Sequence, residues 1–341
     1  MKPWKPVIAA LAFLCLALPS RADVALIVAE PFGRFGAWNP TGHAAIFLTR
    51  VCAETPTTLR RCQPGELGVV ISRYDHVAGR DWLATPLIPF LYAVNNIEEI
   101  PDSADAATVR LLREKYREEH LRDLIPDHPP DETPPGNWIQ LAGAAYDRKL
   151  YFFQIATTAE DDDALIEELN HKRNRERFNL FFRNCADFAS SVINHYYPHA
   201  VHRSYIADFG FTTPKQISKR LVDFSKKHHE YKFTAYTIAQ VPGSPHSRPV
   251  RGVMESLVWT KRYAIPLVIW HPAVVAGIAS GYIARGRFNP SRICETVFTP
   301  ADVRSPTFLA ELRGESAASV AAQTAPAETN DTATRTGPTS P

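Results

Sequence analysis

The chain has 341 residues, of which 45% are hydrophobic and 22% charged, enough to form one large domain or two modest ones. Its formal net charge is +2, from 38 basic and 36 acidic residues. Without the first 22 residues, which hold Lys2, Lys5 and Arg21, 35 basic residues face 36 acidic ones, a net charge of −1. This near-neutral balance gives no electrostatic basis for binding nucleic acid, and no nucleic-acid partner is expected.

Residues 1–22 have the layout of a secretory signal peptide. Lys2 and Lys5 give a positive start, and Val7–Leu18 is an almost unbroken apolar run. The tripeptide Ser20-Arg21-Ala22 then places small residues at −3 and −1 of a cleavage site. An uncleaved anchor helix is the alternative, but the apolar run is short for a membrane span. We therefore expect an exported protein of the periplasm or cell envelope, and we expect its mature chain to start at Asp23.

Two cysteines bracket a polar stretch near the start of the mature chain. Cys52 and Cys62 lie on either side of it, between the strand-like runs Gly42–Val51 and Glu66–Tyr74. In an oxidising compartment this spacing predicts a disulfide that closes a hairpin loop. The simplest pairing of the two flanking runs is antiparallel.

The middle of the chain mixes helices and strands. Asp102–Leu124 has apolar residues along one helical face and ends at the proline-rich loop 126–136. Lys149–Ala156 reads as a strand. Thr158 then caps a helix that has an acidic first turn and a basic end at Lys172–Arg177, as the helix dipole favours.

A third helix is predicted to begin at Cys185. Asn184 is a good N-cap, and an apolar residue recurs at helical spacing until Pro198 ends the helix. Another helix starts at Thr213-Pro214 and a further strand-like run spans Tyr231–Val241. Because strands and helices do not alternate regularly, we predict an α+β domain over residues 23–245.

The C-terminal part contains a hydrophobic segment, residues 246–290, and an Ala/Thr/Pro/Ser-rich tail, residues 315–341, that we expect to be disordered. Within the segment, Ala264–Ala284 is apolar and long enough to span about 30 Å of hydrocarbon. Pro266, His271 and Pro272 weaken that interpretation. The sequence leaves open a membrane span and a buried or amphipathic hairpin.

The chemistry that the sequence suggests centres on Cys185 and His43. A thiolate is favoured at the N-terminus of a helix, where free N–H groups can also hold an oxyanion, and Asn184 is the residue that caps this end. A nucleophilic cysteine needs a base on a facing element. His43 opens a strand, follows a glycine and precedes an apolar run in which a histidine has no packing reason to lie.

The segments GHAAIFL (42–48) and NCADFA (184–189), in that order, resemble the circularly permuted papain-like thiol enzymes. This group includes the lecithin:retinol acyltransferase-like proteins and relatives of the NlpC-type cell-wall peptidases. The resemblance covers roughly residues 40–200. It implies an antiparallel sheet packed against the cysteine-bearing helix. It also implies a thiol hydrolase or acyltransferase with Cys185 as nucleophile and His43 as base, acting on a peptide or acyl-lipid substrate without a cofactor.

The residue that orients the histidine stays open between two neighbours. The strand returning beside His43 carries a polar residue in this family, and Asp75 and His76 are both available, so a change of register by one residue would exchange them. A metal site at His195, His199 and His202 is disfavoured because Pro198 interrupts the helix. The main alternative to catalysis is a non-catalytic envelope protein that uses the same fold for binding.

Overall fold

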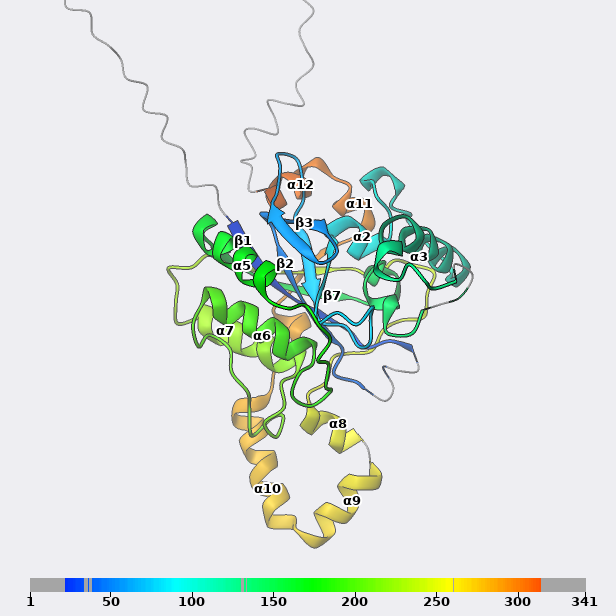
Figure 1. The fold of residues 1–341 in the computed structure, drawn as a ribbon. Helices are drawn as coiled ribbons and strands as arrows, with labels where there is room; N and C mark the ends of the chain where they lie inside the picture. Colours follow the sequence, from blue (N-terminus) through cyan, green and yellow to red (C-terminus); the bar gives the residue numbers. More distant parts are fainter. Residues whose placement is uncertain are drawn as a thin grey trace, which may run out of the picture.

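The computed structural model describes residues 22–313 except 34, 35, 37, 38, 130, 131, 133 and 260. The signal peptide expected over residues 1–22 therefore lies outside the described residues apart from Ala22, and the tail expected over 315–341 lies wholly outside them. The described chain is a mixed α+β structure built on one large, mostly antiparallel sheet, as predicted (Figure 1).

Seven strands form the main sheet in the order β6-β5-β2-β1-β7-β8-β9, and each neighbouring pair is antiparallel except β8 with β9. Two further strands, β3 and β4, pair only with each other. The strand bounds are β1 Ala22–Ala29, β2 His43–Leu48, β3 Val51–Thr55, β4 Thr58–Arg61, β5 Val69–Ser72, β6 Leu83–Pro86, β7 Leu150–Thr157, β8 Phe233–Ile238 and β9 Thr296–Phe298.

Strand β1 lies in the centre of the sheet, and the sequence analysis assigned it no element. Its residues alternate between two cores: Ile27 packs on one face and Val28 on the other. Both faces are buried from Val24 to Ala29, and this stretch is entirely apolar, without the polar–apolar alternation typical of a half-exposed strand. It also follows directly on the apolar run of the expected signal peptide, so its boundary is hard to see in the sequence.

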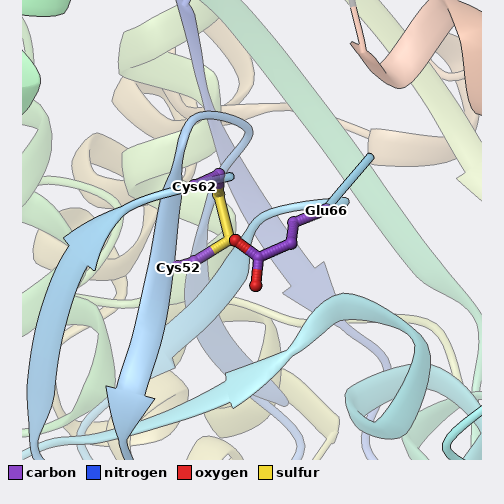
Figure 2. A group of neighbouring side chains, drawn as sticks. All are labelled: Cys52, Cys62 and Glu66. Atoms are coloured by element: carbon purple, nitrogen blue, oxygen red, sulfur yellow. A yellow bond between two sulfur atoms is a disulfide. The ribbon is translucent and has the colours of Figure 1, made fainter. Parts of the chain in front are cut away.

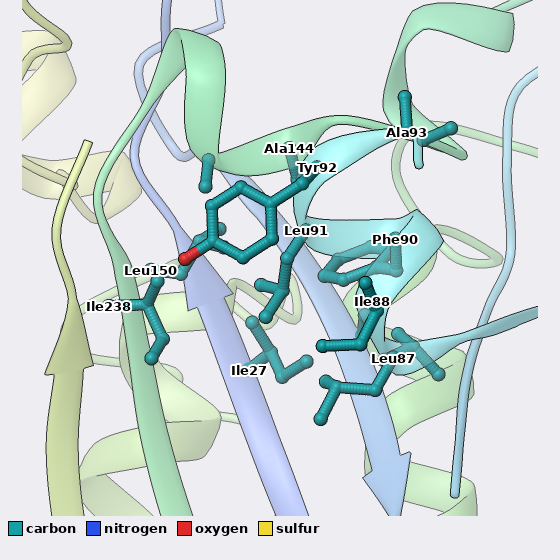
Figure 3. Packing of buried hydrophobic residues seen from close by; sticks show 14 of the residues in the cluster. Ile27, Leu87, Ile88, Phe90, Leu91, Tyr92, Ala93, Ala144, Leu150 and Ile238 are labelled. Carbon is teal, nitrogen blue, oxygen red and sulfur yellow. The ribbon is translucent and has the colours of Figure 1, made fainter. Parts of the chain in front are cut away.

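Helices cover both faces of the sheet. One face carries α5 (Ala159–His171), α6 (Cys185–Tyr196) and α7 (Pro214–Ser225), which share a core with the even-numbered residues of β1. The other face carries α2 (Leu87–Tyr92), α3 (Ala106–His120) and α4 (Ala144–Asp147). Figure 3 shows how Leu87, Leu91 and Tyr92 of α2 lie beside Ile27 of β1 and Ile238 of β8 in that second core.

The predicted helix starts are confirmed by their caps. The side chain of Thr158 accepts a hydrogen bond from the amide of Asp161 at the start of α5. Thr213 does the same for Gln216 at the start of α7, where Pro214 occupies the first turn. Short 3₁₀ turns connect several elements: η1 Ile97–Glu99, η2 Arg122–Leu124, η3 Trp138–Gln140 and η5 Pro290–Arg292.

The predicted disulfide between Cys52 and Cys62 is present, with the two Cα atoms 4.8 Å apart (Figure 2). The polar stretch between the two cysteines is itself the hairpin of β3 and β4. The runs on either side of it pair as β2 and β5, antiparallel as expected. The disulfide therefore fastens a small hairpin that projects from the connection between two strands of the main sheet.

The hydrophobic C-terminal segment forms a series of short helices that project from the body (Figure 1). These are α8 Val253–Trp259, α9 Lys261–Trp270, α10 Pro272–Gly281 and the π-helical turn η4 Tyr282–Gly286. Among the described residues, no helix has both the length and the apolar character required to cross a bilayer. Large side chains such as those of Ile269 and Trp270 are exposed, so this part of the segment is not buried against the described body.

After this segment the chain returns to the sheet. Strand β9 pairs parallel with β8, and α11 (Pro300–Val303) and α12 (Pro306–Arg313) follow it. Val303, Phe308 and Leu312 pack into the core shown in Figure 3. The folded unit thus extends past residue 245, where the sequence analysis placed its end, because a three-residue strand and two short helices carry little sequence signal.

Candidate functional site

Cys185 is the first residue of α6, where a complete capping box fixes the start of the helix. The side-chain oxygen of Asn184 accepts hydrogen bonds from the amides of Ala186 (2.8 Å) and Asp187 (3.0 Å). The carboxylate of Asp187 accepts in return from the amide of Asn184. These reciprocal bonds satisfy orphan amides at the helix start and hold the cysteine in a defined position.

His43 is the first residue of β2, and the glycine before it is required by the backbone. Gly42 has a φ of +75°, and a Cβ at this position would overlap the carbonyl oxygen of Ala29 on β1. Only glycine combines this left-handed conformation with such a close approach. The Gly42-His43 pair seen in the sequence therefore fixes where β2 begins and where the imidazole lies.

Helix α6 packs against β2, which brings the predicted pair to one place. The amide of Ala44 donates a hydrogen bond to Cys185 Sγ over 3.4 Å, so the thiol lies against the backbone next to His43. Both side chains line a cleft of about 320 Å³. In the described part of the chain, no hydrogen bond joins the thiol directly to the imidazole. The pair shares a cleft, and a direct proton exchange requires the two groups to come within hydrogen-bonding distance.

Ser72, at the end of β5, orients the histidine. Its hydroxyl donates to the carbonyl of Ala44 over 2.7 Å, and its oxygen lies 3.0 Å from His43 Nε2. Because the hydroxyl has only one proton, Ser72 Oγ accepts from Nε2–H. This assignment places the ring proton on Nε2 and leaves Nδ1 as the basic nitrogen. The ring of Tyr74 stacks on the imidazole of His43, with ring centroids 5.3 Å apart.

The two residues that the sequence offered for this orienting role lie elsewhere. Asp75 lines the cleft, and its carboxylate binds His76 Nδ1 over 2.5 Å. The side chain of His76 is 71% exposed, and its amide donates to Glu176. Asp75 and His76 therefore bind each other, and in the described structure neither is hydrogen-bonded to His43, although Asp75 lines the same cleft. Ser72 was within the stretch expected to return beside His43, but a serine hydroxyl gave no distinguishing signal there.

Burial controls the protonation of both members of the pair. It raises the pKa of Cys185 above its ordinary value, and hydrogen bonds from the amides of Ala44 and Ala186 only partly offset this effect. Burial also holds the pKa of His43 well below 6.5, and the positive charge of Arg148 lowers it further. At neutral pH both groups are therefore uncharged, in contrast to the thiolate that the helix N-terminus alone suggested.

Arg148 is a functional candidate that the sequence analysis missed. Its side chain is fully buried, with Nε and Nη2 lacking a hydrogen-bond partner within the described structure, and its guanidinium lies over the ring of Phe32 at 4.9 Å. Burial lowers its pKa to about 10, so it stays charged at neutral pH. A buried cation near the pair favours a negative charge on Cys185 and disfavours protonation of His43 to the imidazolium.

The amides available for an oxyanion are fewer than the helix start suggests. The amides of Ala186 and Asp187 already donate to the Asn184 side chain. The Asn184 amide group donates to the carbonyls of Leu180 (3.0 Å) and Thr212 (3.1 Å), so both of its protons are used as well. Asn184 is thus a structural cap. The amide of Cys185 itself is the remaining main-chain candidate at this position.

Apolar side chains form one part of the cleft lining. Leu180 and Phe181 precede the cysteine helix and are about half exposed, and Phe211 packs on Phe181 with ring centroids 5.4 Å apart. Val253, the first residue of α8, lines the same cleft. The cleft therefore combines the thiol and imidazole with apolar side chains and with polar ones such as Arg73 and Asp75, an arrangement that suits a substrate with both polar and apolar portions.

Two groups of potential metal ligands occur in the described part of the chain. In the first, Cys52 and Cys62 are joined as a disulfide beside Glu66 and have no thiolate to offer (Figure 2). The second comprises Asp75, His76 and Glu176, in which both carboxylates accept a hydrogen bond from His76, and Asp75 also lines the cleft.

His195 and His202, two of the three histidines considered for a metal site, and the second free cysteine make contacts outside the cleft that Cys185 lines. His195 binds Glu168 over 2.7 Å, and His202 Nδ1 lies 3.1 Å from the carbonyl oxygen of Arg203, so the two rings make separate contacts. Cys294 is a buried free thiol in the core on the α6 side of the sheet, and burial raises its pKa to about 12. It is inert by comparison with the partly accessible Cys185.

Comparisons with known proteins add no family to this description. No protein-family model, no curated protein and no solved structure matches the chain.

Proposed function

We propose that the protein is an exported thiol hydrolase or acyltransferase of the permuted papain-like type, with Cys185 as nucleophile and His43 as general base. The observation that carries this proposal is the position of the two side chains in one cleft. One is fixed by a capping box and the other by Ser72, which leaves Nδ1 of the imidazole unprotonated. A positioned thiol beside a neutral, oriented base is the minimum that acyl transfer to cysteine requires.

The proposed reaction starts from the uncharged pair. As Sγ of Cys185 attacks the carbonyl carbon of an ester, thioester or amide, the thiol proton passes to Nδ1 of His43, which forms an imidazolium. The oxygen of the tetrahedral intermediate accepts from the Cys185 amide. Collapse breaks the bond to the leaving group, which takes the proton from the imidazolium and leaves an acyl-thioester on Cys185.

The second half of the reaction regenerates the thiol. Water or an acceptor hydroxyl or amine gives its proton to Nδ1 and attacks the thioester carbonyl, and the proton then returns to the departing sulfur. The buried charge of Arg148 stabilises negative charge that develops on sulfur in both halves. Cell-wall peptides and acyl lipids of the envelope are the two substrate classes that fit a cleft lined by both polar and apolar side chains.

Trapping the acyl group on the enzyme tests this proposal directly. Protein incubated with a p-nitrophenyl acyl ester should gain one acyl group, and peptide mass spectrometry should locate it on the peptide containing Cys185. Cys185→Ala should abolish the adduct and His43→Gln should reduce its rate by about a hundredfold or more. Cys294→Ala is the matched control and should acylate normally, because Cys294 is buried outside the cleft. An unmodified Cys185 in folded protein would contradict the proposal.

A non-catalytic envelope binding protein is the second candidate. It is favoured by the raised pKa of Cys185 and by the lack of a direct bond between thiol and imidazole in the described structure. In that case Cys185→Ala would leave the affinity for a bound peptide or lipid unchanged, and no ester or amide would be turned over.

A further inference from the structure

The short helices α9 and α10 expose apolar side chains that nothing in the described chain covers. They form, with the turn that follows, an arm over residues 261–284, which projects away from the sheet (Figure 1). The large exposed side chains of the arm are those of Ile265 (55%), Val268 (48%), Ile269 (68%), Trp270 (75%), Val274 (55%) and Ile283 (63%). Contiguous apolar exposure of this kind marks an interaction surface.

The lysine and arginine residues in and beside the arm have no acidic neighbours in the sequence. Between Glu255 and Glu295 the sequence contains no acidic residue, whereas it contains Lys261, Arg262, Arg285, Arg287 and Arg292. The basic residues flank the apolar arm on both sides and leave its middle free of charge. Apolar residues bordered by lysine and arginine match an anionic bilayer, which has an apolar interior and negatively charged headgroups.

The lengths of α9 and α10 fit insertion into one leaflet of a bilayer. Each helix has ten residues, about 15 Å at 1.5 Å per residue, or half the thickness of the hydrocarbon core. Trp270 ends α9 and Pro272 begins α10, so the turn between them is where the chain reverses. Tryptophan is a residue that favours the interface between headgroups and acyl chains.

A second apolar patch continues from the arm to the cleft. Tyr205, Ile206 and Phe209 are exposed, and Ile206 lies against Gly281 of α10. The same loop is tied to α8, because Ala207 accepts from the amide of Met254. Phe182, 58% exposed, packs on Phe211, which lines the cleft. These contacts connect the arm through the 205–209 loop and α8 to the region of the cleft.

We propose that the arm of residues 261–284, together with the exposed residues of the 205–209 loop, docks the protein on an anionic lipid bilayer. The arm enters one leaflet and the basic residues at its two ends bind lipid phosphates. This docking brings the mouth of the cleft next to the lipid surface. The proposal concerns where the protein binds and stands whether or not Cys185 is a nucleophile.

Vesicle flotation tests the docking. The probe is phosphatidylcholine vesicles with about one third phosphatidylglycerol, compared with phosphatidylcholine alone. The protein should float with the anionic vesicles and bind the neutral ones more weakly. The double variant I269E/W270E should bind the anionic vesicles at least tenfold more weakly. The matched control is Leu111→Glu on α3, a side chain that is 65% exposed outside the arm and should not affect binding.

A second readout separates the arm from any other lipid-binding segment. Lipids brominated on their acyl chains should quench tryptophan fluorescence when the protein binds, and Trp270→Phe should remove a large part of that quenching. Equal flotation of I269E/W270E and the parent, or quenching unaffected by Trp270→Phe, would overturn the proposal. So would a dimer that forms without lipid and is dissociated by I269E/W270E, since the arm would then bind a second copy of the chain.

Discussion

Ser72 Oγ lies 3.0 Å from His43 Nε2 while its own proton goes to the carbonyl of Ala44. This relationship links β5 to the first two residues of β2, so the register of two strands determines the tautomer of the imidazole. A hydroxyl in this position is a weaker orienting group than a carboxylate, because it brings no negative charge to stabilise an imidazolium.

Ser72→Ala should lower kcat by about tenfold to a hundredfold and change KM little, since the ring then loses the acceptor that keeps its proton on Nε2. Ser72→Thr, which retains a hydroxyl, should restore part of the rate. Thr85→Val on the neighbouring strand β6 is the matched control, because the Thr85 hydroxyl is buried without a hydrogen-bond partner in the described structure. Steady-state kinetics on an ester substrate measure all three. Full activity in Ser72→Ala would show that the hydrogen bond has no part in catalysis.

Arg148→Met should raise the pKa of His43 toward its ordinary value. The positive guanidinium opposes protonation of the ring, so its removal favours the imidazolium and moves the acidic limb of the rate profile to higher pH. NMR titration of the histidine ring signals measures the change, and the other histidines of the same spectrum serve as internal controls. An unchanged His43 titration would mean that burial alone sets this pKa. The rate above that limb should also fall, because the sulfur loses a nearby cation.

Much of the fold could be predicted because its local signals agree with one another. Thr158 and Asn184 are predicted as caps from residue type and context, and a helix start is predicted at Thr213-Pro214. All three side chains accept a capping hydrogen bond. Strand β1 was missed for a physical reason, since a strand buried on both faces lacks alternation. The return of the chain to the sheet at β9 could not be foreseen either, because it depends on a three-residue parallel pairing formed after a long excursion.

The site was predicted only as far as short-range sequence signals reach. The Gly42-His43 strand start and the Asn184-Cys185 helix start were visible, and the structure places both at one cleft. The identity of the orienting residue depends on strand register, which decides between neighbours that point to opposite faces. The protonation of the pair depends on burial and on Arg148, which lies far from both residues in the sequence and joins them only through the tertiary structure.

Gly42→Ala should destabilise the protein by about 3 kcal/mol or more, since the new Cβ adds a clash with the Ala29 carbonyl to the strain of a positive φ. Gly65→Ala is the matched control: its φ is +91°, but a Cβ there has no atom within 4 Å. We expect it to cost only about 1 kcal/mol. Chemical denaturation compares the two, and equal losses would show that the approach of β1 does not require glycine at position 42.

Replacing both Cys52 and Cys62 by alanine should lower the free energy of unfolding by about 2–3 kcal/mol, because the disulfide closes a loop of ten residues in the unfolded chain. Acylation of Cys185 under native conditions should continue, since neither residue lines the cleft. Mass spectrometry without reduction should find one linked peptide pair in the parent protein. Free thiols at both positions in protein from the periplasm or medium would contradict an exported, oxidised state.

Asp162→Asn should change how stability depends on pH. Asp162 is buried in the first turn of α5 and accepts a hydrogen bond from the Tyr196 hydroxyl at 2.8 Å. Burial raises its pKa to about 6, compared with 3.8 in its ordinary state. Between these values the folded protein retains a proton that the unfolded chain releases. The contribution of this group to stability is therefore complete below pH ~4 and is lost as the pH rises to ~6.

Through this group the free energy of unfolding should fall by roughly 3 kcal/mol between pH 4 and 6, and the asparagine variant should lack this fall. Urea denaturation at pH 4, 5, 6 and 7 gives the difference between parent and variant at each pH, so that titrations common to both cancel. Asp163→Asn is the matched control, because exposed Asp163 pairs with Arg61 and has a lowered pKa, which gives a small dependence of the opposite sign. If the difference between parent and Asp162→Asn were constant from pH 4 to 7, Asp162 would be ionised in the folded protein throughout. The Tyr196 hydroxyl would then be donating to a buried carboxylate.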